Sequence, residues 1–165
     1  MGVYVMKKYS ISEIQIEQSQ EVDYLYEQLS PGKNRHLSQE NISNFQSHFK
    51  FFGAKELDES LGNAGKIVSI ATLALVYTGE KCFGQVHEVV TDEHHRGKQF
   101  GRSMSLAEEV MLYIADYAKK IGLAYLEITS KPSREVADKL YRKVGYKLVA
   151  QAVDDTGVNL YSLYL

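Results

Sequence analysis

Residues 89–102 are the feature that most limits how this chain can fold. An apolar, β-branched run leads into a polar turn, and a basic, glycine-spaced loop follows before a long amphipathic segment. This order predicts a strand, a loop and a helix that begins near Gly101. A helix N-terminus presents unpaired N–H groups and about half a positive charge, so it attracts anions. The stretch therefore predicts a site for a phosphate or pyrophosphate.

The side chains of the loop support this interpretation. Arg96, Lys98 and Arg102 add positive charge, and an arginine can hold a phosphate with several donors. Gly97 and Gly101 carry no Cβ, so the backbone can adopt positive φ and a bulky anion can come close. The loop has neither the Gly-x-Gly-x-x-Gly of dinucleotide sites nor the Gly-Lys-Ser/Thr ending of a P-loop. An ordinary strand-to-helix turn with solvated basic side chains stays open as the alternative.

Composition favours one soluble globular domain over residues 1–165. Hydrophobic residues make up 44% and charged residues 24%, and the formal net charge of −2 gives no basic excess that would indicate nucleic-acid binding. Cys82 is the only cysteine, which excludes an internal disulfide and a thiolate metal cluster. The chain shows no signal-peptide pattern and no apolar run of membrane-spanning length. We therefore expect a cytoplasmic protein that does not act at a membrane.

Hydrophobic periodicity predicts a regular order of elements, β-α-α-β-β-β-α-β-α-β-β. The strands are expected at 10–17, 51–57, 66–77, 82–91, 124–129, 146–153 and 159–165. The helices are expected at 21–29, 39–50 and 101–120, and from Pro132 to Val144 with an inner face that includes Val136. The near-continuous apolar run at 66–77 indicates a central strand covered on both faces. The fold class is therefore α/β (α+β), a mixed sheet of about seven strands with about four helices on its two faces.

The order of elements and two sequence blocks resemble the GNAT (GCN5-related N-acetyltransferase) superfamily. The first block is the strand Val89-Val90-Thr91 with the loop at 96–101, and the second is residues 130–146, which include Ala137, Leu140, Tyr141 and Gly145-Tyr146. The family's loop has Arg or Gln, two residues, Gly, one residue, then Gly or Ala. Arg96 and Gly101 match its ends, whereas Gln99 stands where the inner glycine usually lies. The resemblance does not identify an acceptor subgroup.

This resemblance implies a GNAT-type, mostly antiparallel twisted sheet and acetyl-CoA as cosubstrate. In the family, backbone groups of the fourth strand pair with pantetheine, which here places Val89, Val90 and Thr91 along it. The family's loop holds the pyrophosphate through its N–H groups. The corresponding residues in this chain are Arg96, Gly97, Lys98, Gln99, Phe100, Gly101 and Arg102.

The resemblance also implies catalytic residues. Tyr141 matches the tyrosine that protonates the departing thiolate, although a core tyrosine is the alternative. Glu88 and His87 are the candidates for the base that accepts the amine proton, and adjacent strand residues point to opposite faces, so at most one should face the acetyl group. Glu127 on the next strand is a third candidate, or a substrate ligand. A backbone N–H near Val89 or Val90 is expected to stabilise the oxyanion.

The implied activity is direct transfer of an acetyl group from acetyl-CoA to a primary amine of a small molecule or peptide. A catalytically inactive acetyl-CoA sensor or scaffold, an amino-sugar-phosphate N-acetyltransferase and a phosphate-binding module unrelated to CoA stay open. His94 and His95 are interpreted as solvated loop residues, and no metal is expected. A homodimer is possible because the strand at 159–165 could pair across two copies.

Overall fold

A seven-stranded sheet organises the protein, and its strands lie in the order β1-β2-β3-β4-β5-β7-β6. The computed structural model describes residues 9–16, 20–33, 40, 48–57, 65–98 and 102–165. Only β4 and β5 are parallel, whereas all other neighbouring strands are antiparallel. The mixed, mostly antiparallel sheet is therefore confirmed. Its strands are β1 (Tyr9–Ile14), β2 (Phe49–Glu56), β3 (Lys66–Tyr77), β4 (Cys82–Thr91), β5 (Tyr125–Ser130), β6 (Lys147–Ala150) and β7 (Asn159–Tyr164).

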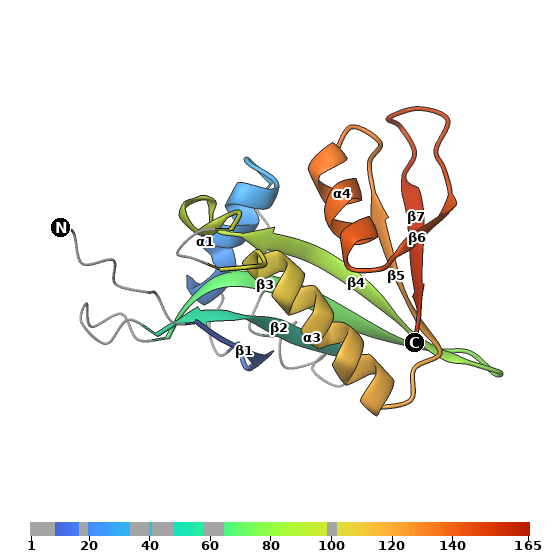
Figure 1. Ribbon diagram of the computed structural model, residues 1–165, viewed down its shortest axis with the longest axis horizontal. Helices are drawn as coiled ribbons and strands as arrows, with labels where there is room; N and C mark the ends of the chain where they lie inside the picture. Colours follow the sequence, from blue (N-terminus) through green and yellow to red (C-terminus); the bar gives the residue numbers. More distant parts are fainter. Residues whose placement is uncertain (1–8, 17–19, 34–39, 41–47, 58–64, 99–101) are drawn as a thin grey trace.

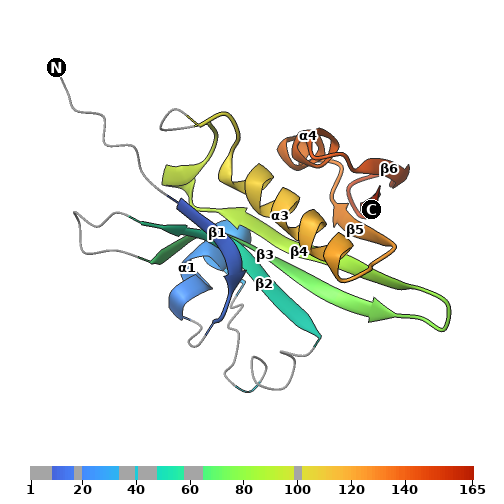
Figure 2. The same ribbon diagram turned by 60° about the horizontal axis from the view of Figure 1, so that its bottom comes forward.

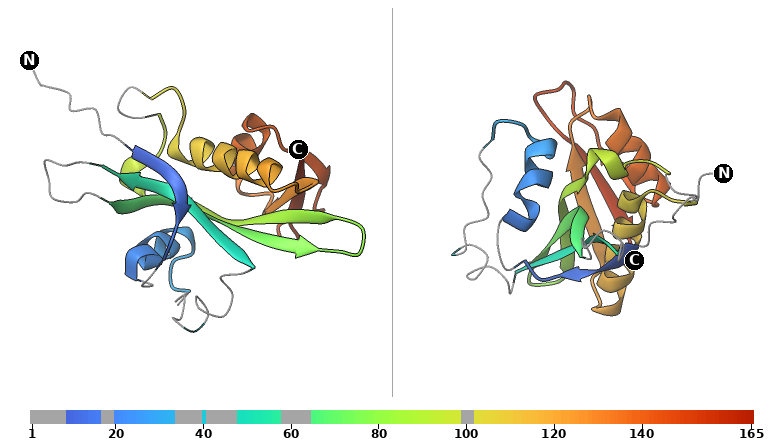
Figure 3. Two further views of the ribbon diagram at one scale, coloured as in Figure 1. Left: turned by 90° about the horizontal axis from the view of Figure 1, so that it is seen from below. Right: turned by 90° about the vertical axis from the view of Figure 1, so that its left-hand side faces the viewer.

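Helices cover both faces of this sheet. Helix α1 (Gln20–Leu29) packs on one face against β3 and β4, and α3 (Leu106–Lys120) and α4 (Glu135–Lys143) lie on the other face (Figure 3, right). A short 3-10 turn, η2 (Glu93–His95), follows β4. None of the described helices is long and apolar enough to cross a membrane.

Two apolar clusters result from this arrangement. The larger one lies between the sheet and α3, where Val110, Met111 and Ile114 are buried against strand residues such as Phe52 and Leu73. The smaller one lies under α1, whose residues Val22, Leu25 and Tyr26 pack on Ile67, Ile70 and Val90. Strand β3 contributes to both clusters, since its residues from Ile67 to Leu73 are all buried. The prediction of a central strand covered on both faces is confirmed for this part of β3.

Strands β3 and β4 have the bounds that the sequence predicts, and they form a hairpin whose turn reaches beyond the neighbouring strands (Figure 2). Thr78 closes the turn, because its backbone N–H and its hydroxyl both donate to the Lys81 carbonyl, each at 2.9 Å. This hairpin places β4 beside β5 and delivers the chain to the loop that follows Thr91.

Several predicted helix positions need correction. Helix α3 begins at Leu106 and not near Gly101, because Ser105 caps it: the Ser105 hydroxyl accepts from the Glu108 N–H, and the Glu108 carboxylate accepts from the Ser105 N–H. The helix expected at 39–50 lies mostly outside the described residues, although Glu40 is helical and the last two residues belong to β2. Val136 was expected on the inner face of α4 but is 83% exposed.

Candidate acetyl-CoA and catalytic site

The site begins where β4 and β5 separate. The two strands pair at Gly84–Leu126, Gln85–Glu127 and Val86–Ile128, and no further pair joins them although both are described to their ends at Thr91 and Ser130. Figure 1 shows the ribbons of β4 and β5 diverging from this point toward their C-terminal ends. The second half of β4 therefore has one backbone edge that faces a gap in the sheet and can pair with an extended ligand.

Gly84 allows the close approach at the base of this gap. A Cβ at this position would stand 2.6 Å from a Leu73 methyl carbon and 2.7 Å from a Leu126 methyl carbon, distances that real Cβ atoms essentially never show. A Cβ here would have to displace the ends of the Leu73 and Leu126 side chains, so glycine suits the close packing of β4 between β3 and β5.

A β-bulge lies beside the gap. His87 pairs with Thr72 and Val90 pairs with Ile70, so Glu88 and Val89 together stand opposite Ala71. Glu88 has a φ of 55°, in the left-handed region that residues other than glycine rarely adopt. The strand alternation used to place His87 and Glu88 on opposite faces therefore does not hold across this bulge. A bulge also takes backbone groups out of the regular ladder.

The three predicted pantetheine residues form the last part of β4. Val90 and Thr91 are buried and pair with Ile70 and Ser69 of β3, and Val89 is half-buried toward the α3 side of the sheet. The Thr91 hydroxyl lies 2.8 Å from the Ser69 hydroxyl. The backbone edge of this segment that faces β3 is therefore occupied by strand pairing, while its opposite backbone edge borders the gap.

The predicted anion loop starts directly after η2. Arg96 folds back on the strand, since its Nε donates to the Thr91 carbonyl at 2.9 Å and its Nη2 donates to Gln28 of α1 at 3.4 Å. Gly97 has a φ of 77°, which confirms the expected positive φ. Arg96, Gly97 and Lys98 are exposed; the donors of Gly97 and Lys98 can reach a ligand, whereas two Arg96 nitrogens already bond within the protein. Gln99, Phe100 and Gly101 lie outside the described residues.

Acidic side chains of α3 already pair with basic side chains near this loop. Arg102 forms an ion pair with Glu109, and Lys143 of α4 forms one with Glu108 of α3. Burial raises the pKa of Glu108, but hydrogen bonds from Lys143 and the Ser105 backbone outweigh it, so this pKa lies below its ordinary value and the group is charged. The N-terminus of α3 is thus already compensated by acidic residues. An anion would be held by the loop N–H groups and basic side chains more than by the helix dipole.

Tyr141 lies on the inner face of α4 and is 7% exposed. Its ring packs edge-on against Tyr161 of β7 at a centroid distance of 5.4 Å, and Tyr146 lies 6.3 Å away. Burial raises the pKa of Tyr141 to about 12, so the phenol is neutral near neutral pH. Its hydroxyl has no hydrogen-bond partner among the described residues, and a donor is therefore available to a ligand.

The candidate bases occupy different positions. Gln85 pairs with Glu127, and His87 follows Gln85 by two residues, so the side chains of His87 and Glu127 lie on the same face of the sheet as α1. His87 is exposed, whereas Glu127 and Glu88 are half-buried. The structure thus brings His87 and Glu127 to one face beside the gap and places Glu88 at the bulge itself.

Comparison with known proteins identifies the family. A family model described as the acetyltransferase (GNAT) family matches residues 14–146. The chain belongs to this family. No curated protein matches the chain.

Solved structures of GNAT fold agree with this assignment. Arabidopsis thaliana NAA60 in complex with acetyl-CoA has a TM-score of 0.75 and 11% identity, and covers 96% of this chain and 99% of its own. Arabidopsis thaliana glucosamine-6-phosphate N-acetyltransferase has a TM-score of 0.65 and 18% identity, with 89% and 97% covered. An acetyltransferase from Streptococcus agalactiae has a TM-score of 0.68 and 13% identity, with 95% and 98% covered. At these identities the likeness shows the fold.

A buried cluster lies directly before the predicted anion loop, and sequence reasoning missed it. His94 is exposed as expected, but the interpretation of His95 as solvated is wrong, because its side chain is 6% exposed and lies between carboxylates of Asp92 and Glu56. No local pattern indicates this burial, since Glu56 lies 39 positions earlier in the sequence. Its only sequence signal is that Asp92 suits the N-cap of the turn that follows it.

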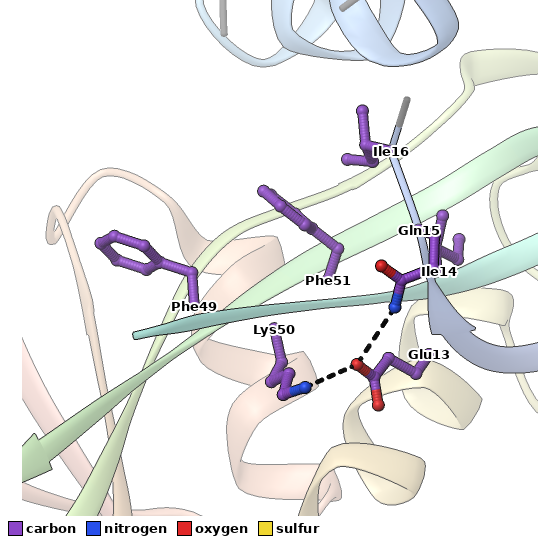
Figure 4. A pocket seen from close by; sticks show the side chains of 7 residues that line it. All are labelled: Glu13, Ile14, Gln15, Ile16, Phe49, Lys50 and Phe51. Carbon is purple, nitrogen blue, oxygen red and sulfur yellow. Dashed lines mark hydrogen bonds and ion pairs between the residues drawn. The ribbon is translucent and has the colours of Figure 1, made fainter. Parts of the chain in front are cut away.

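A small pocket at the β1–β2 edge is separate from the GNAT cofactor path. It is lined by Glu13, Ile14, Gln15, Ile16, Phe49, Lys50 and Phe51, and Figure 4 shows Lys50 and Gln15 both directed to the Glu13 carboxylate. Strand β3 lies between this pocket and β4. Its volume of about 120 Å³ is below the roughly 300–1,000 Å³ that is usual for small-molecule sites. The pocket therefore carries no catalytic assignment.

Proposed function

We propose that the protein is an acetyl-CoA-dependent N-acetyltransferase that moves the acetyl group directly to a primary amine of a small molecule or peptide, with residues 1–165 as one catalytic domain. The observation that carries this proposal is the separation of β4 from β5, which a basic loop follows along the chain. Tyr141, whose hydroxyl has no partner among the described residues, adds a donor. These three features supply a backbone edge for an extended ligand, an anion site and a hydrogen-bond donor.

The cofactor residues fit acetyl-CoA in their chemistry. The gap-facing edge of Val89, Val90 and Thr91 offers peptide groups for an amide-containing arm, apart from the Val90 and Thr91 carbonyls, which accept from Ser69 and Arg96. The exposed loop offers N–H groups and cations for a pyrophosphate. Arg96, Gly97, Lys98, Gln99, Phe100, Gly101 and Arg102 form this loop. Acetyl-CoA supplies the activated acetyl thioester. NAA60, which has the same fold, has been solved with acetyl-CoA, and this supports the assignment.

Tyr141 would stabilise the leaving sulfur. A pKa of about 12 keeps the hydroxyl protonated, but it also stands well above the value of about 8.5 for an ordinary thiol. Complete proton transfer from Tyr141 to the thiolate would therefore be unfavourable. The residue is better suited to hold the thiolate with a charge-assisted hydrogen bond while solvent delivers the final proton.

Glu88 is the proposed base for the amine proton, directly or through water. Its position at the bulge places it beside the free edge of β4, and its half-buried side chain is less solvated than the exposed His87. His87 is the second candidate, and Glu127, which shares its face, is suited to bind a cationic amine. A backbone N–H released by the bulge near Val89 or Val90 would stabilise the oxyanion.

The test is acetyl-CoA turnover with a panel of amines, monitored by thiol release and by mass of the product. The panel includes peptides with free amino termini, since NAA60 has also been solved with a bisubstrate analogue, and amino-sugar phosphates, since a glucosamine-6-phosphate N-acetyltransferase shares the fold. We expect acetylation of at least one class, with a rate that falls about 100-fold in the Tyr141→Phe variant. Tight acetyl-CoA binding without turnover of any amine would instead support a sensor or scaffold.

A further inference from the structure

The buried cluster at the start of the cofactor loop joins three ionisable side chains. His95 Nδ1 lies 3.2 Å from Asp92 Oδ2, and His95 Nε2 lies 3.2 Å from Glu56 Oε2. The three residues are 7%, 4% and 7% exposed for His95, Asp92 and Glu56, respectively. This cluster takes no part in the proposed acetyl transfer, yet burying three such groups is costly unless they are paired.

The position of His95 between two carboxylates requires one proton more than a neutral histidine carries. A neutral imidazole has one N–H donor, and an ionised carboxylate only accepts, so an imidazole between two carboxylates needs both ring nitrogens protonated or one carboxyl protonated. Burial raises the pKa of Asp92, but bonds from the His94 backbone and Gln28, with the charges of His95 and Lys66, outweigh it and lower this pKa. Asp92 is therefore ionised, and the geometry leaves the additional proton on the imidazole or on the Glu56 carboxyl.

Groups on each packed element surround the cluster. From β1, the Tyr9 ring meets His95 edge-on at 6.1 Å, and burial together with the Glu56 charge raises the pKa of Tyr9 to about 12, so this phenol is neutral. From β3, Lys66 Nζ lies 3.9 Å from Asp92 Oδ2 and 4.7 Å from the centroid of the Tyr24 ring of α1. The guanidinium of Arg102, which follows the loop in the sequence, lies over the Tyr9 ring, 4.8 Å from the ring centroid.

The cluster is joined directly to the cofactor loop. The His95 N–H donates to the Asp92 carbonyl at 2.8 Å, and the Asp92 N–H donates to Val68 of β3 at the same distance. Gln28 of α1 accepts from the Glu93 N–H at 2.9 Å. His95 immediately precedes Arg96 and Gly97, so the turn that starts the loop is held on β2, β3 and α1 through these contacts.

We propose that His95 is a positioning residue for acetyl-CoA binding: its two ring nitrogens, which contact Glu56 and Asp92, hold the start of the cofactor loop beside the free edge of β4. The inference rests on the proposed function for its ligand. It has two consequences. Loss of the imidazole weakens acetyl-CoA binding, and it loosens the turn at His95 in the ligand-free protein.

The first test compares His95→Leu with His94→Leu, the exposed neighbour in the same turn. Calorimetry with acetyl-CoA should give a dissociation constant about tenfold higher for His95→Leu and an unchanged one for His94→Leu. The KM for the amine should stay unchanged, whereas a merely destabilised protein would lose active fraction without a selective change for acetyl-CoA. Equal affinities in wild type and His95→Leu would overturn the inference.

The second test uses Glu56→Gln, which keeps size and changes only the proton requirement. A carboxamide can donate to Nε2, so a neutral His95 can then bridge both neighbours. Glu56→Gln should therefore keep the acetyl-CoA affinity of the wild type, unlike His95→Leu. An affinity about tenfold weaker in Glu56→Gln would overturn the bridging role of His95.

A third measurement separates this inference from the proposed function. Hydrogen exchange of the ligand-free protein reports the His95 amide, which donates to the Asp92 carbonyl. Exchange there should be faster in His95→Leu than in wild type and unchanged in His94→Leu, whether or not acetyl-CoA is the ligand. Failure of wild type to bind acetyl-CoA would count against the proposed function, whereas unchanged exchange in His95→Leu would count against the positioning role.

Discussion

Along its edge toward β3, β4 pairs at eight positions, whereas toward β5 it pairs at three and then separates. The paired edge is backed by both apolar clusters, with Ile70, Leu73 and Val86 almost fully buried. On the separated side, the last five residues of β4 border a gap, and the loop that follows is exposed. One strand therefore serves stability on one edge and leaves backbone groups for a ligand on the other. The two sides should respond differently to substitution.

The largest effect is expected on the paired side. Leu73→Ala removes a fully buried side chain of β3 and should lower the free energy of unfolding by about 3 kcal/mol, measured by urea denaturation. Well below the unfolding midpoint, the dissociation constant for acetyl-CoA should not change. Leu112→Ala, at a 40% exposed position of α3, is the control and should cost much less. A large loss of affinity in folded Leu73→Ala would show that the two edges are not independent.

On the open side, where β4 and β5 separate, substitution of Tyr141 should instead affect catalysis. Tyr141→Phe removes the proposed hydrogen bond to the leaving sulfur, so kcat should fall about 100-fold while acetyl-CoA binding persists. Tyr146→Phe is the matched control, because its buried hydroxyl also has no partner within the described part of the chain. Its removal should leave kcat unchanged and leave stability equal or higher. Steady-state kinetics on both variants decides between a catalytic and a packing role for Tyr141.

A smaller effect on acetyl-CoA binding is expected from backbone strain in the loop. Two glycines allow this effect on binding to be separated from an effect on stability. Gly97 and Gly122 have φ values of 77° and 80°, and a Cβ at either would meet nothing within 4 Å. Valine at either position should cost roughly 1–2 kcal/mol of strain. At Gly97 the loop can escape that strain by moving, so acetyl-CoA should bind about tenfold more weakly. Gly122→Val, after α3, should lower the melting temperature without changing affinity.

The paired side was largely predictable from the sequence. The apolar run of β3 and the turn at Thr78 are local signals, and both strands of this hairpin have their predicted bounds. The inner faces of α1 and α3 follow from helical spacing. The start of α3 could also have been predicted, because Ser105-x-x-Glu108 is a capping-box sequence. The apolar Met104, which fits the helical spacing, favoured an earlier start.

The open side depends on contacts that are distant in sequence. The gap exists because β4 and β5 stop pairing after Val86, and nothing in either segment alone indicates that point. Glu88 at positive φ has no local signal, since glycine or asparagine would be expected there. The burial of His95 requires Glu56 from another strand. The anion loop could therefore be located from its own residues, the catalytic candidates came from the family resemblance, and the geometry came from the structure.

The smallest expected effect concerns the ion pair between Glu108 and Lys143, which joins the first turn of α3 to the last turn of α4. The pKa of Glu108 lies below its ordinary value of 4.5 in the folded protein. A lowered pKa contributes stability that is present above the unfolded value and is lost as pH falls through the folded one. Glu108→Gln should therefore reduce the loss of stability below pH 4.5, measured as urea midpoints over an acid series.

Glu80→Gln, in the exposed β3–β4 turn, is the control for this pH series and should keep the wild-type acid dependence. If Glu108→Gln also kept it, the carboxylate would not be paired in solution, and the helices on the open side would be held by apolar contacts alone. A reduced acid dependence would instead show that Lys143 and the Ser105 N–H hold Glu108 in its charged form, on the side where β4 has lost its strand partner. The open side would then be stabilised in part by a contact that titrates, whereas the paired side is stabilised by strand pairing and apolar clusters, which do not titrate.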